Sequence, residues 1–271
     1  MKKIIFIGIL IGIYLYATDD YIKPDKTYTM ICKDTIVDIN FAKNSKQVLY
    51  DSSKINQEKP LFNMGINYCK IDNHLYLSAG ETFKYDIKKK NLIKSFIKGD
   101  LLTCMIDKKL IFYLKEDKLY EYSFREDKSY YIGQSRSNLA WNHSRISIVN
   151  NKWIFFNDYK EVYRYDLSTR EVKKEEIKDC NIAHINMKNT LLCRNRNYEE
   201  NKPYFTIDPM SYKKEYIDLK GSRDAFYDKE LNGIFYTRYD FDLVNMREYR
   251  PSYFYSIEED KEYFLSKECH F

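Results

Sequence analysis

The sequence predicts an all-β fold built from six similar four-stranded units, and two observations lead to this prediction. First, a four-residue motif recurs six times: an aromatic or β-branched residue, any residue, an aromatic or aliphatic residue, and then Asp or Ser. Its copies occupy residues 48–51, 83–86, 120–123, 163–166, 205–208 and 253–256. Second, consecutive copies end 35, 37, 43, 42 and 48 residues apart, and a recurrence at such a period indicates a repeat architecture.

Each unit divides into four short strands. In the fourth unit, apolar runs cover 146–149, 153–156, 162–165 and 171–177, with an Asn-Asn turn after the first. Short runs rich in Tyr, Phe, Ile and Val, separated by Asn or Asp, are typical of strands and hairpins. The closing Asp or Ser can bond the backbone two residues on, so we expect it to start the turn between third and fourth strands. Alternation places the first and third motif residues on one face, where they can pack against a neighbouring sheet.

Six such units predict a single six-bladed β-propeller of four-stranded blades, in which the blades bury their faces against one another. The expected blades cover 28–62, 63–97, 98–133, 134–177, 178–218 and 219–266. A β-sandwich is the alternative, but it gives no reason for six matching units. The segment 162–169, Val-Tyr-Arg-Tyr-Asp-Leu-Ser-Thr, resembles the third-strand and turn segment of TolB-like and prolyl-oligopeptidase-type propellers. This resemblance covers residues 28–266 and implies an architecture, not a subfamily or an activity.

The N-terminus has the pattern of a secretory signal peptide. Two lysines precede an uncharged stretch of 13 residues, 4–16, and the small residue Ala17 follows. We therefore expect a signal peptide over 1–17, a tether over 18–27 and the propeller over 28–271. An uncleaved anchor is the alternative, although a spanning helix needs about 20 apolar residues. The protein is expected to be periplasmic or secreted, in a bacterial envelope.

The charge balance of the exported chain is mild. Without Lys2 and Lys3, 43 basic residues face 40 acidic ones, a net charge of +3. This balance gives no argument for nucleic acid or a membrane surface as a partner. We expect a monomer that touches the membrane only through its signal segment.

Six cysteines in an exported chain predict disulfides. Two lie on the first two strands of blade 5, at similar distances from their turn. Another pair would join the ends of the ring, from the first strand of blade 1 to the segment after blade 6. The third pair occupies matching inner-strand positions of blades 2 and 3, and could form a disulfide or two buried thiols. The three pairs are Cys180 with Cys193, Cys32 with Cys269, and Cys69 with Cys104. No Cys-x-x-Cys spacing occurs, so we expect no metal or cofactor there.

Two candidate binding regions follow from the blade assignment. Loops between second and third strands share one end of a propeller with the connections between blades. These loops are short in blades 2–4 and long at 194–202 and 238–252. The long loops would form a ridge rich in Arg and Tyr, residue types over-represented at interface hot spots. Its candidate residues are Arg194, Arg196, Arg238, Tyr239, Arg247, Tyr249 and Arg250.

The second candidate region precedes blade 4, at the rim of the central channel. Trp141, His143 and Arg145 lie there within a short polar segment. They would form a binding patch, or else a packed tryptophan with solvated neighbours.

The sequence assigns no catalytic residue. It has no Gly-x-Ser-x-Gly elbow, phosphate-binding glycine loop or two-histidine zinc helix. The favoured hypothesis is an exported non-enzymatic propeller that binds another protein through the long loops of blades 5 and 6, for instance a bacterial envelope inhibitor or immunity protein. One alternative is a metal-dependent, lactonase-like hydrolase using Asn142, Asn181 and Asp224 in the channel. Another is a scaffold in an envelope complex.

Overall fold

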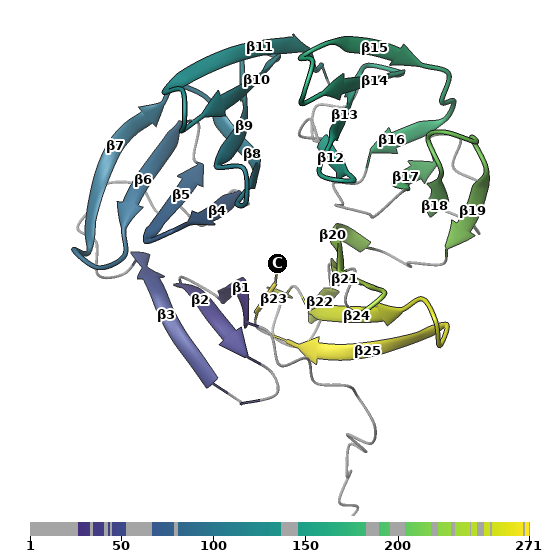
Figure 1. The fold of residues 1–271 in the computed structure, drawn as a ribbon. Helices are drawn as coiled ribbons and strands as arrows, with labels where there is room; N and C mark the ends of the chain where they lie inside the picture. Colours follow the sequence, from purple (N-terminus) through teal and green to yellow (C-terminus); the bar gives the residue numbers. More distant parts are fainter. Residues whose placement is uncertain are drawn as a thin grey trace, which may run out of the picture.

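The computed structural model describes residues 27–270 except 33–34, 41–42, 44, 53–66, 79–80, 137–145, 183–189, 196–203, 218–221, 229–230, 239, 243–246, 250 and 268. The described residues form strands and turns, with no α-helix among them. Six four-stranded antiparallel sheets stand in a ring (Figure 1). The predicted all-β, six-bladed β-propeller is confirmed.

In each of blades 2–6, the first strand in sequence is the innermost of the ring and the fourth is the outermost. Blade 2 contains β4 (Tyr68–Ile71), β5 (His74–Ser78), β6 (Thr82–Asp86) and β7 (Asn91–Ile97). Blade 3 contains β8 (Asp100–Met105), β9 (Leu110–Lys115), β10 (Lys118–Ser123) and β11 (Lys128–Gln134). Blade 4 contains β12 (Ile146–Val149), β13 (Trp153–Asp158), β14 (Glu161–Asp166) and β15 (Val172–Glu175).

Blades 5 and 6 continue the same order, and blade 6 carries an insertion. Blade 5 contains β16 (Cys180–Ile182), β17 (Leu191–Asn195), β18 (Tyr204–Ile207) and β19 (Lys214–Ile217). Blade 6 contains β20 (Ser222–Asp228), β21 (Gly233–Arg238), β24 (Ser252–Ser256) and β25 (Lys261–Ser266). Between β21 and β24, β22 (Asp240–Asp242) and β23 (Arg247–Tyr249) form a separate two-stranded sheet.

Blade 1 is completed by the C-terminal strand. It consists of β1 (Thr27–Cys32), β2 (Thr35–Asn40) and β3 (Ser45–Asp51), with β26 (Cys269–His270) paired to β1. The sequence placed Cys32 on the first strand of blade 1, and this position was wrong. β1 is the second strand, because β26 supplies the innermost one and so closes the ring.

The predicted role of the motif in turns is confirmed in blades 2–6. The closing carboxylates Asp86, Asp166 and Asp208 each accept a hydrogen bond from the amide two residues on, at 3.0, 2.8 and 2.7 Å. The closing serines of blades 3 and 6 accept from the amide three residues on, at 3.4 and 3.3 Å. Four residues after each closing residue, the backbone is left-handed, with φ between 48° and 59° at Lys90, Asp127, Arg170, Tyr212 and Asp260. One turn design therefore joins third to fourth strands.

The first copy of the motif, residues 48–51, does not follow this design. It lies on β3, the outermost strand of blade 1, whereas the other five copies lie on third strands. The third strand of blade 1 is β2, which ends at Asn40, and the Asn40 side chain accepts a hydrogen bond from the Lys43 amide at 2.8 Å. The true first copy is therefore residues 37–40, Val-Asp-Ile-Asn, with Asn in place of Asp or Ser.

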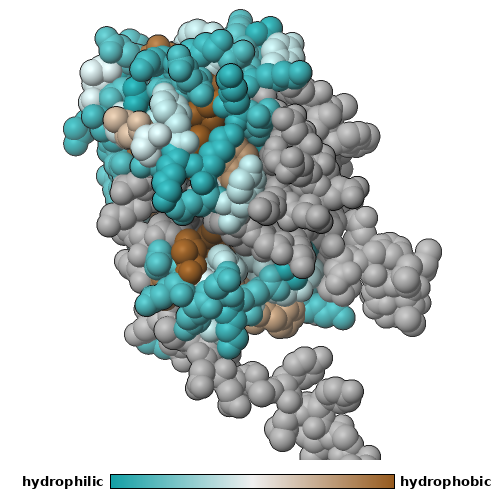
Figure 2. All heavy atoms as spheres, turned by 90° about the vertical axis from the view of Figure 1, so that its right-hand side faces the viewer, coloured by the Kyte–Doolittle hydropathy of each residue, from teal (hydrophilic) through white to brown (hydrophobic). Residues whose placement is uncertain are grey.

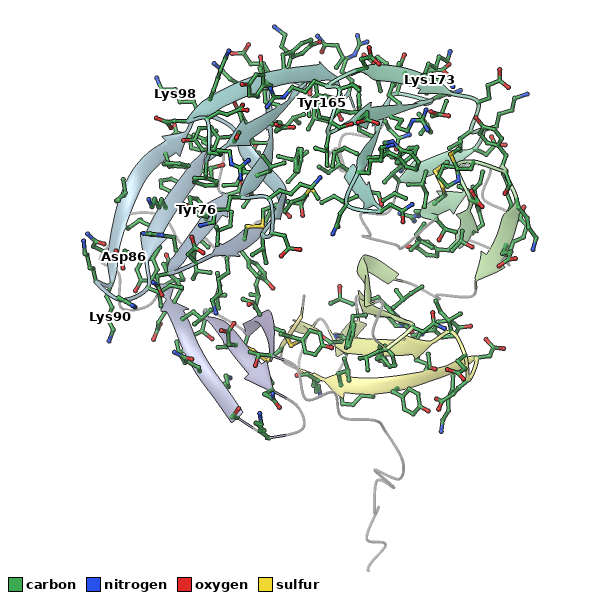
Figure 3. All side chains as sticks on the ribbon, viewed as in Figure 1. Tyr76, Asp86, Lys90, Lys98, Tyr165 and Lys173 are labelled. Carbon is green, nitrogen blue, oxygen red and sulfur yellow. A yellow bond between two sulfur atoms is a disulfide. The ribbon has the colours of Figure 1, made fainter. Side chains whose placement is uncertain are left out.

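The core lies between the blades. The first and third motif residues face the preceding blade, as Tyr163 and Tyr165 do in the cluster between blades 3 and 4. Phe205 and Ile207 pack in the same way against blade 4, and Val37 against blade 6. Figure 3 shows Tyr76 and Tyr165 directed between sheets, while Lys90, Lys98 and Lys173 point away from the ring. The packing of apolar faces across successive blades is what stabilises the closed ring.

All six cysteines are paired. Cys32–Cys269 joins directly opposed residues of β1 and β26, with a Cα–Cα distance of 4.1 Å. Cys69–Cys104 joins the innermost strands of blades 2 and 3, so these residues are a disulfide and not two thiols. Cys180–Cys193 joins β16 to β17; the two residues are offset by two positions in the register and do not face each other directly. Disulfides of this kind persist in oxidising compartments.

The described outer surface is mostly hydrophilic on the side of the ring shown in Figure 2. On the side of the ring that carries β15 and β19, apolar side chains form only small separate areas (Figure 2). Each outermost strand nevertheless exposes one large apolar residue: Val48, Ile93, Tyr131, Val172, Tyr216 and Phe264. Across the described part of the chain, no helix has the length and apolar character needed to span a membrane.

Candidate functional site

The two long loops leave the same end of the ring, as the blade assignment predicted. In blades 2–4 the connections between second and third strands cover only 79–81, 116–117 and 159–160, whereas in blades 5 and 6 they cover 196–203 and 239–251. In the blade 6 loop, Asp240 pairs with Tyr249 and Asp242 with Arg247, which makes a short β-hairpin. This hairpin is the only two-stranded sheet within the described residues.

The ridge residues predicted from the sequence are only partly described. Arg194 is half-buried near the end of β17, opposite Tyr204 in the register. Arg247 and Tyr249 are the first and last residues of β23. Arg196, Tyr239 and Arg250 lie outside the described residues.

Arg238 has contacts that fix it at the base of the hairpin. Its guanidinium forms an ion pair with Glu262 of β25 and bonds the Tyr236 hydroxyl at 3.2 Å. It also lies 4.4 Å from the ring centroid of Tyr253. Its amide donates to the Pro251 carbonyl at 3.1 Å, so both ends of the insertion are tied together. Arg238 therefore positions the hairpin, and its predicted contact with a partner stays a prediction.

Trp141, His143 and Arg145 lie outside the described residues; the last described residue of blade 3 before that segment is Arg136. Arg136 binds the Asp158 carboxylate with two nitrogens, at 2.9 and 2.7 Å. These hydrogen bonds hold the pKa of the Asp158 carboxyl below its usual value. The Arg136 guanidinium also lies 4.5 Å from the ring centroid of Tyr159, whose side chain is 45% exposed.

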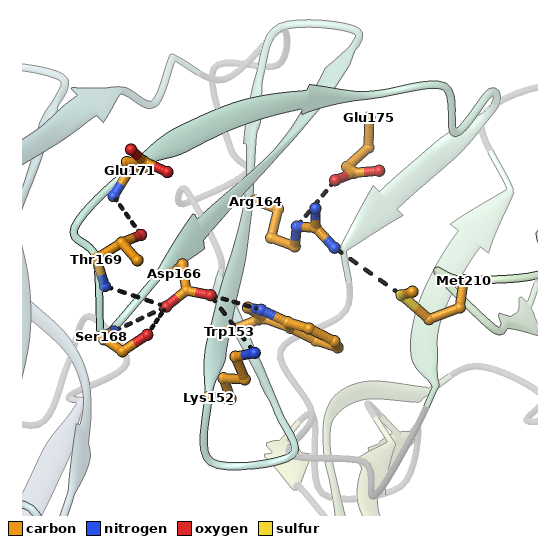
Figure 4. Close-up of polar contacts among 9 residues, drawn as sticks. All are labelled: Lys152, Trp153, Arg164, Asp166, Ser168, Thr169, Glu171, Glu175 and Met210. Carbon is orange, nitrogen blue, oxygen red and sulfur yellow. Dashed lines mark hydrogen bonds and ion pairs between the residues drawn. The ribbon is translucent and has the colours of Figure 1, made fainter.

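A cluster that sequence reasoning missed lies at the opposite end of the ring, where blades 4 and 5 meet (Figure 4). We call it the blade 4–5 patch, and its members are Lys152, Trp153, Arg164, Met210 and Tyr212. The half-buried indole of Trp153 has the Lys152 ammonium and the Arg164 guanidinium each 5.0 Å from its ring centroid. Met210 is 65% exposed and Tyr212 is 40% exposed. Aromatic residues, Met and Arg are enriched in the contact surfaces of protein complexes.

Two carboxylates beneath the patch hold its aromatic and cationic side chains. Asp166 accepts from the Trp153 ring nitrogen at 3.1 Å and from the amides of its own turn. The Ser168 hydroxyl, those amides and the indole together hold the pKa of Asp166 well below its usual value, so its charge persists at any physiological pH.

Glu175 is the second carboxylate, and it is 3% exposed. Its Oε1 lies 3.0 Å from Arg164 Nε, an ion pair without hydrogen-bond geometry. Its Oε2 accepts from the Tyr212 hydroxyl at 3.1 Å. A buried carboxylate needs such partners, and here they fix Arg164 from blade 4 and Tyr212 from blade 5 in one place.

The turn design offered a signal for this patch. Two and four residues after the closing residue, the turn exposes its side chains to solvent. At those two positions blade 2 has Lys88 and Lys90, blade 3 has Arg125 and Asp127, and blade 4 has Ser168 and Arg170. Blade 5 places Met210 and Tyr212 there, and both are exposed. An apolar and an aromatic residue at turn positions that are otherwise polar could have been noticed in the sequence.

The structure describes the backbone of two of the three residues considered for a hydrolase. Asn181 lies on β16 and Asp224 on β20, in different blades, and Asn142 lies outside the described residues. Within the described ranges, no group of three or more His, Cys, Asp or Glu side chains is placed to hold a metal ion.

Comparison with known proteins gives similarity in structure alone. No protein-family model matches the chain, and no curated protein matches its sequence. A chain of a nidogen–laminin complex aligns over 90% of this protein and 96% of its own length, at 7% identity and a TM-score of 0.60. An auxiliary nutrient-binding protein from Bacteroides thetaiotaomicron aligns over 79% of this protein and 64% of its own length, at 11% identity and a TM-score of 0.51.

The protein shares its fold with β-propellers. Porphyromonas gingivalis dipeptidyl peptidase 4 aligns at 13% identity and a TM-score of 0.49, over 89% of this protein. This chain spans about half, 52%, of the length of that peptidase. At these identities the two neighbours with TM-scores of 0.60 and 0.51 show a shared fold and nothing of function, which depends on the sites that a chain carries on its fold.

Proposed function

We propose that the protein is an exported, non-enzymatic β-propeller that binds another protein through the loops joining second to third strands in blades 5 and 6. The observation that carries the proposal is the β22–β23 hairpin. It replaces a connection that covers only two or three residues in blades 2–4 with a separate sheet. Long loops held by a rigid scaffold are where proteins commonly place their binding residues.

The base of the hairpin supports this role because several contacts hold it in place. Arg238 is held by Glu262, Tyr236 and the Pro251 carbonyl. A binding loop whose base is fixed loses less conformational entropy when it engages a partner. The sequence of the hairpin and its flanks adds Arg247, Tyr249 and Arg250, residue types that dominate binding energy at interfaces.

Export is supported by the pairing of all six cysteines in disulfides, which form and persist in oxidising compartments. The signal-peptide pattern at residues 1–17 agrees with it. Non-enzymatic character rests on the sequence, which has none of the catalytic motifs sought above. The nidogen–laminin complex gives a precedent, since a chain of this architecture takes part there in a protein complex.

More specifically, we propose that the protein is a bacterial envelope inhibitor or immunity protein whose partner is a toxin or an enzyme. A toxin gene beside this one would support that form. An assay of the purified partner with equimolar propeller separates it from a scaffold, because an inhibitor abolishes the partner's activity and a scaffold leaves it unchanged.

The test of binding is affinity capture on the immobilised mature protein from an envelope extract of the source cells. In one variant, residues 239–251 are replaced by the two-residue Tyr-Lys connection of blade 4. In a second, Arg247 and Arg250 are both changed to Glu. We expect both variants to lose the captured partner while their thermal unfolding stays close to that of the native protein.

The matched control reverses charge at the other end of the ring, with Lys88→Glu and Lys89→Glu in the exposed turn of blade 2. This control should retain the partner. A partner that stays bound after the hairpin is replaced would remove blades 5 and 6 from the binding role.

A further inference from the structure

The blade 4–5 patch differs from the other exposed apolar positions of the protein. Every outermost strand exposes one large apolar residue, so exposure alone distinguishes nothing. At the junction of blades 4 and 5, two cations lie near the Trp153 indole, and one of them, Arg164, contacts an exposed methionine. Tyr130 also has two cations near its ring, Lys128 and Arg170, so the exposed methionine is what sets the blade 4–5 junction apart. The patch therefore combines an apolar contact area with positive charge.

The side chains of the patch are already held in place. Trp153 is fixed by Asp166, and Arg164 and Tyr212 by the buried Glu175. Both anchoring carboxylates belong to blade 4, whereas Tyr212 belongs to blade 5, so the patch forms only when the two blades pack. Side chains ordered before binding lose little rotamer freedom when a partner arrives.

The most exposed charged groups at the patch are lysines, so its exposed charge is positive. The Glu175 side chain is 2% exposed and its ion-pair partner Arg164 is 19% exposed. Asp166 is 22% exposed and forms an ion pair with Lys152 at 3.8 Å. The Lys152 side chain, by contrast, is 53% exposed, and Lys173 is exposed as well. Lys173 lies directly opposite Arg164 in the β14–β15 register, and like charges in that position repel. A carboxylate of a binding partner would reduce the repulsion between Lys173 and Arg164.

One hydrogen-bond donor of Arg164 has only a weak acceptor within the protein. Its Nη1 points to the Met210 sulfur at 4.0 Å, and a thioether is a weak acceptor. A carboxylate in that place would form a charge-assisted hydrogen bond, which is much stronger. The exposed thioether and the indole would then contact an apolar side chain next to that carboxylate.

We infer that the blade 4–5 patch is a second docking surface, for an acidic segment of a protein partner that carries an apolar side chain beside its carboxylates. The carboxylates lie between Lys152, Arg164 and Lys173, and the apolar side chain lies against Trp153 and Met210. This inference rests on the proposed function in requiring a protein partner. It assigns a contact at the opposite end of the ring from the β22–β23 hairpin.

The test uses a phage library of random twelve-residue peptides, selected on the immobilised mature protein. We expect enriched peptides to contain Asp or Glu next to Leu, Ile or Phe. One such synthetic peptide should bind at least tenfold more weakly to Arg164→Gln and to Met210→Ser than to the native protein. Binding should also weaken steeply with salt. Lys89→Glu, in the equivalent turn of blade 2, is the matched control and should leave the affinity unchanged.

A second readout locates the contact. In a Trp141→Phe background, Trp153 is the one remaining tryptophan, so its fluorescence should change on peptide addition. Met210→Ser alters a side chain that is 65% exposed, so it keeps the test decisive even where Arg164→Gln lowers the stability of the fold.

Three results would overturn the inference: no enrichment, enriched peptides without acidic residues, or an affinity insensitive to both substitutions. The outcome is separate from that of the proposed function. Peptide binding is also measured on the hairpin-replacement variant, which should bind the peptide normally. The role of the hairpin is decided by the capture of the natural partner.

Discussion

The disulfide that closes the ring should contribute more stability than either of the others. Replacing Cys32 and Cys269 together with Ala removes the bond between β1 and β26, whose residues are 237 apart in sequence. In the chain-entropy description, a closed loop of that length raises the free energy of unfolding by about 5.5 kcal/mol. Domains of this kind are stable by only about 5–15 kcal/mol. The double variant should therefore lose a large share of its total stability.

The other two bridges provide matched controls. Cys180–Cys193 closes a separation of 13 residues and Cys69–Cys104 one of 35. The same description assigns them about 3 and about 4 kcal/mol. Each pair is replaced by Ala, because the cysteines are largely buried and a hydroxyl there would need a partner.

The assay is equilibrium unfolding in urea without reductant, followed by fluorescence and far-UV circular dichroism. The midpoint should fall in the order of loop length: most for the ring-closing pair, least for the blade 5 hairpin pair. If the ring-closing variant loses no more stability than the hairpin variant, the argument from unfolded-chain entropy fails. Ring closure would then depend on the packing of β1 against blade 6 and not on the covalent link.

Three further predictions concern single residues. Gly233→Ala should lower the stability by about 1–3 kcal/mol in urea unfolding, because a Cβ there would overlap the Phe254 ring. Glu121→Ala should cost about 2 kcal/mol by leaving the buried Tyr165 hydroxyl of blade 4 unpaired, and Glu121→Gln should cost less than half of that. The pKa of Asp166 is lowered mainly by the Ser168 hydroxyl, so its stabilising effect is complete above its unfolded pKa and is lost as pH falls through the lower folded value. The Tm difference between the native protein and Asp166→Asn should accordingly be largest near pH 7 and disappear in acid; a constant difference would contradict the linkage.

Much of the fold could be predicted because the local rules of strands and turns repeat along the chain. The closing Asp or Ser starts the same turn in five blades, and alternation directs the motif aromatics to the preceding blade. Blade 1 was misaligned because residues 48–51 satisfy the motif while lying on an outermost strand. Only the pairing of β26 with β1 reveals the shift, and that contact joins residues far apart in the chain.

The candidate site was less predictable, for a related reason. Loop lengths indicated the ridge of blades 5 and 6, and the insertion there is real. The role of Arg238 was not visible, since its partners come from β21, β24 and β25 together. The blade 4–5 patch was missed because Trp153 and Met210 are distant in sequence and belong to different blades.

By itself, then, the amino-acid order determined the strand content, the turn chemistry and the number of blades, since each depends on neighbouring residues. Tertiary structure alone decided how the ring closes, which exposed side chains are held in place and where positive charge meets an apolar surface. Those features arise from the packing of one blade on the next. Their energies depend on contacts between residues that the sequence separates by tens or hundreds of positions.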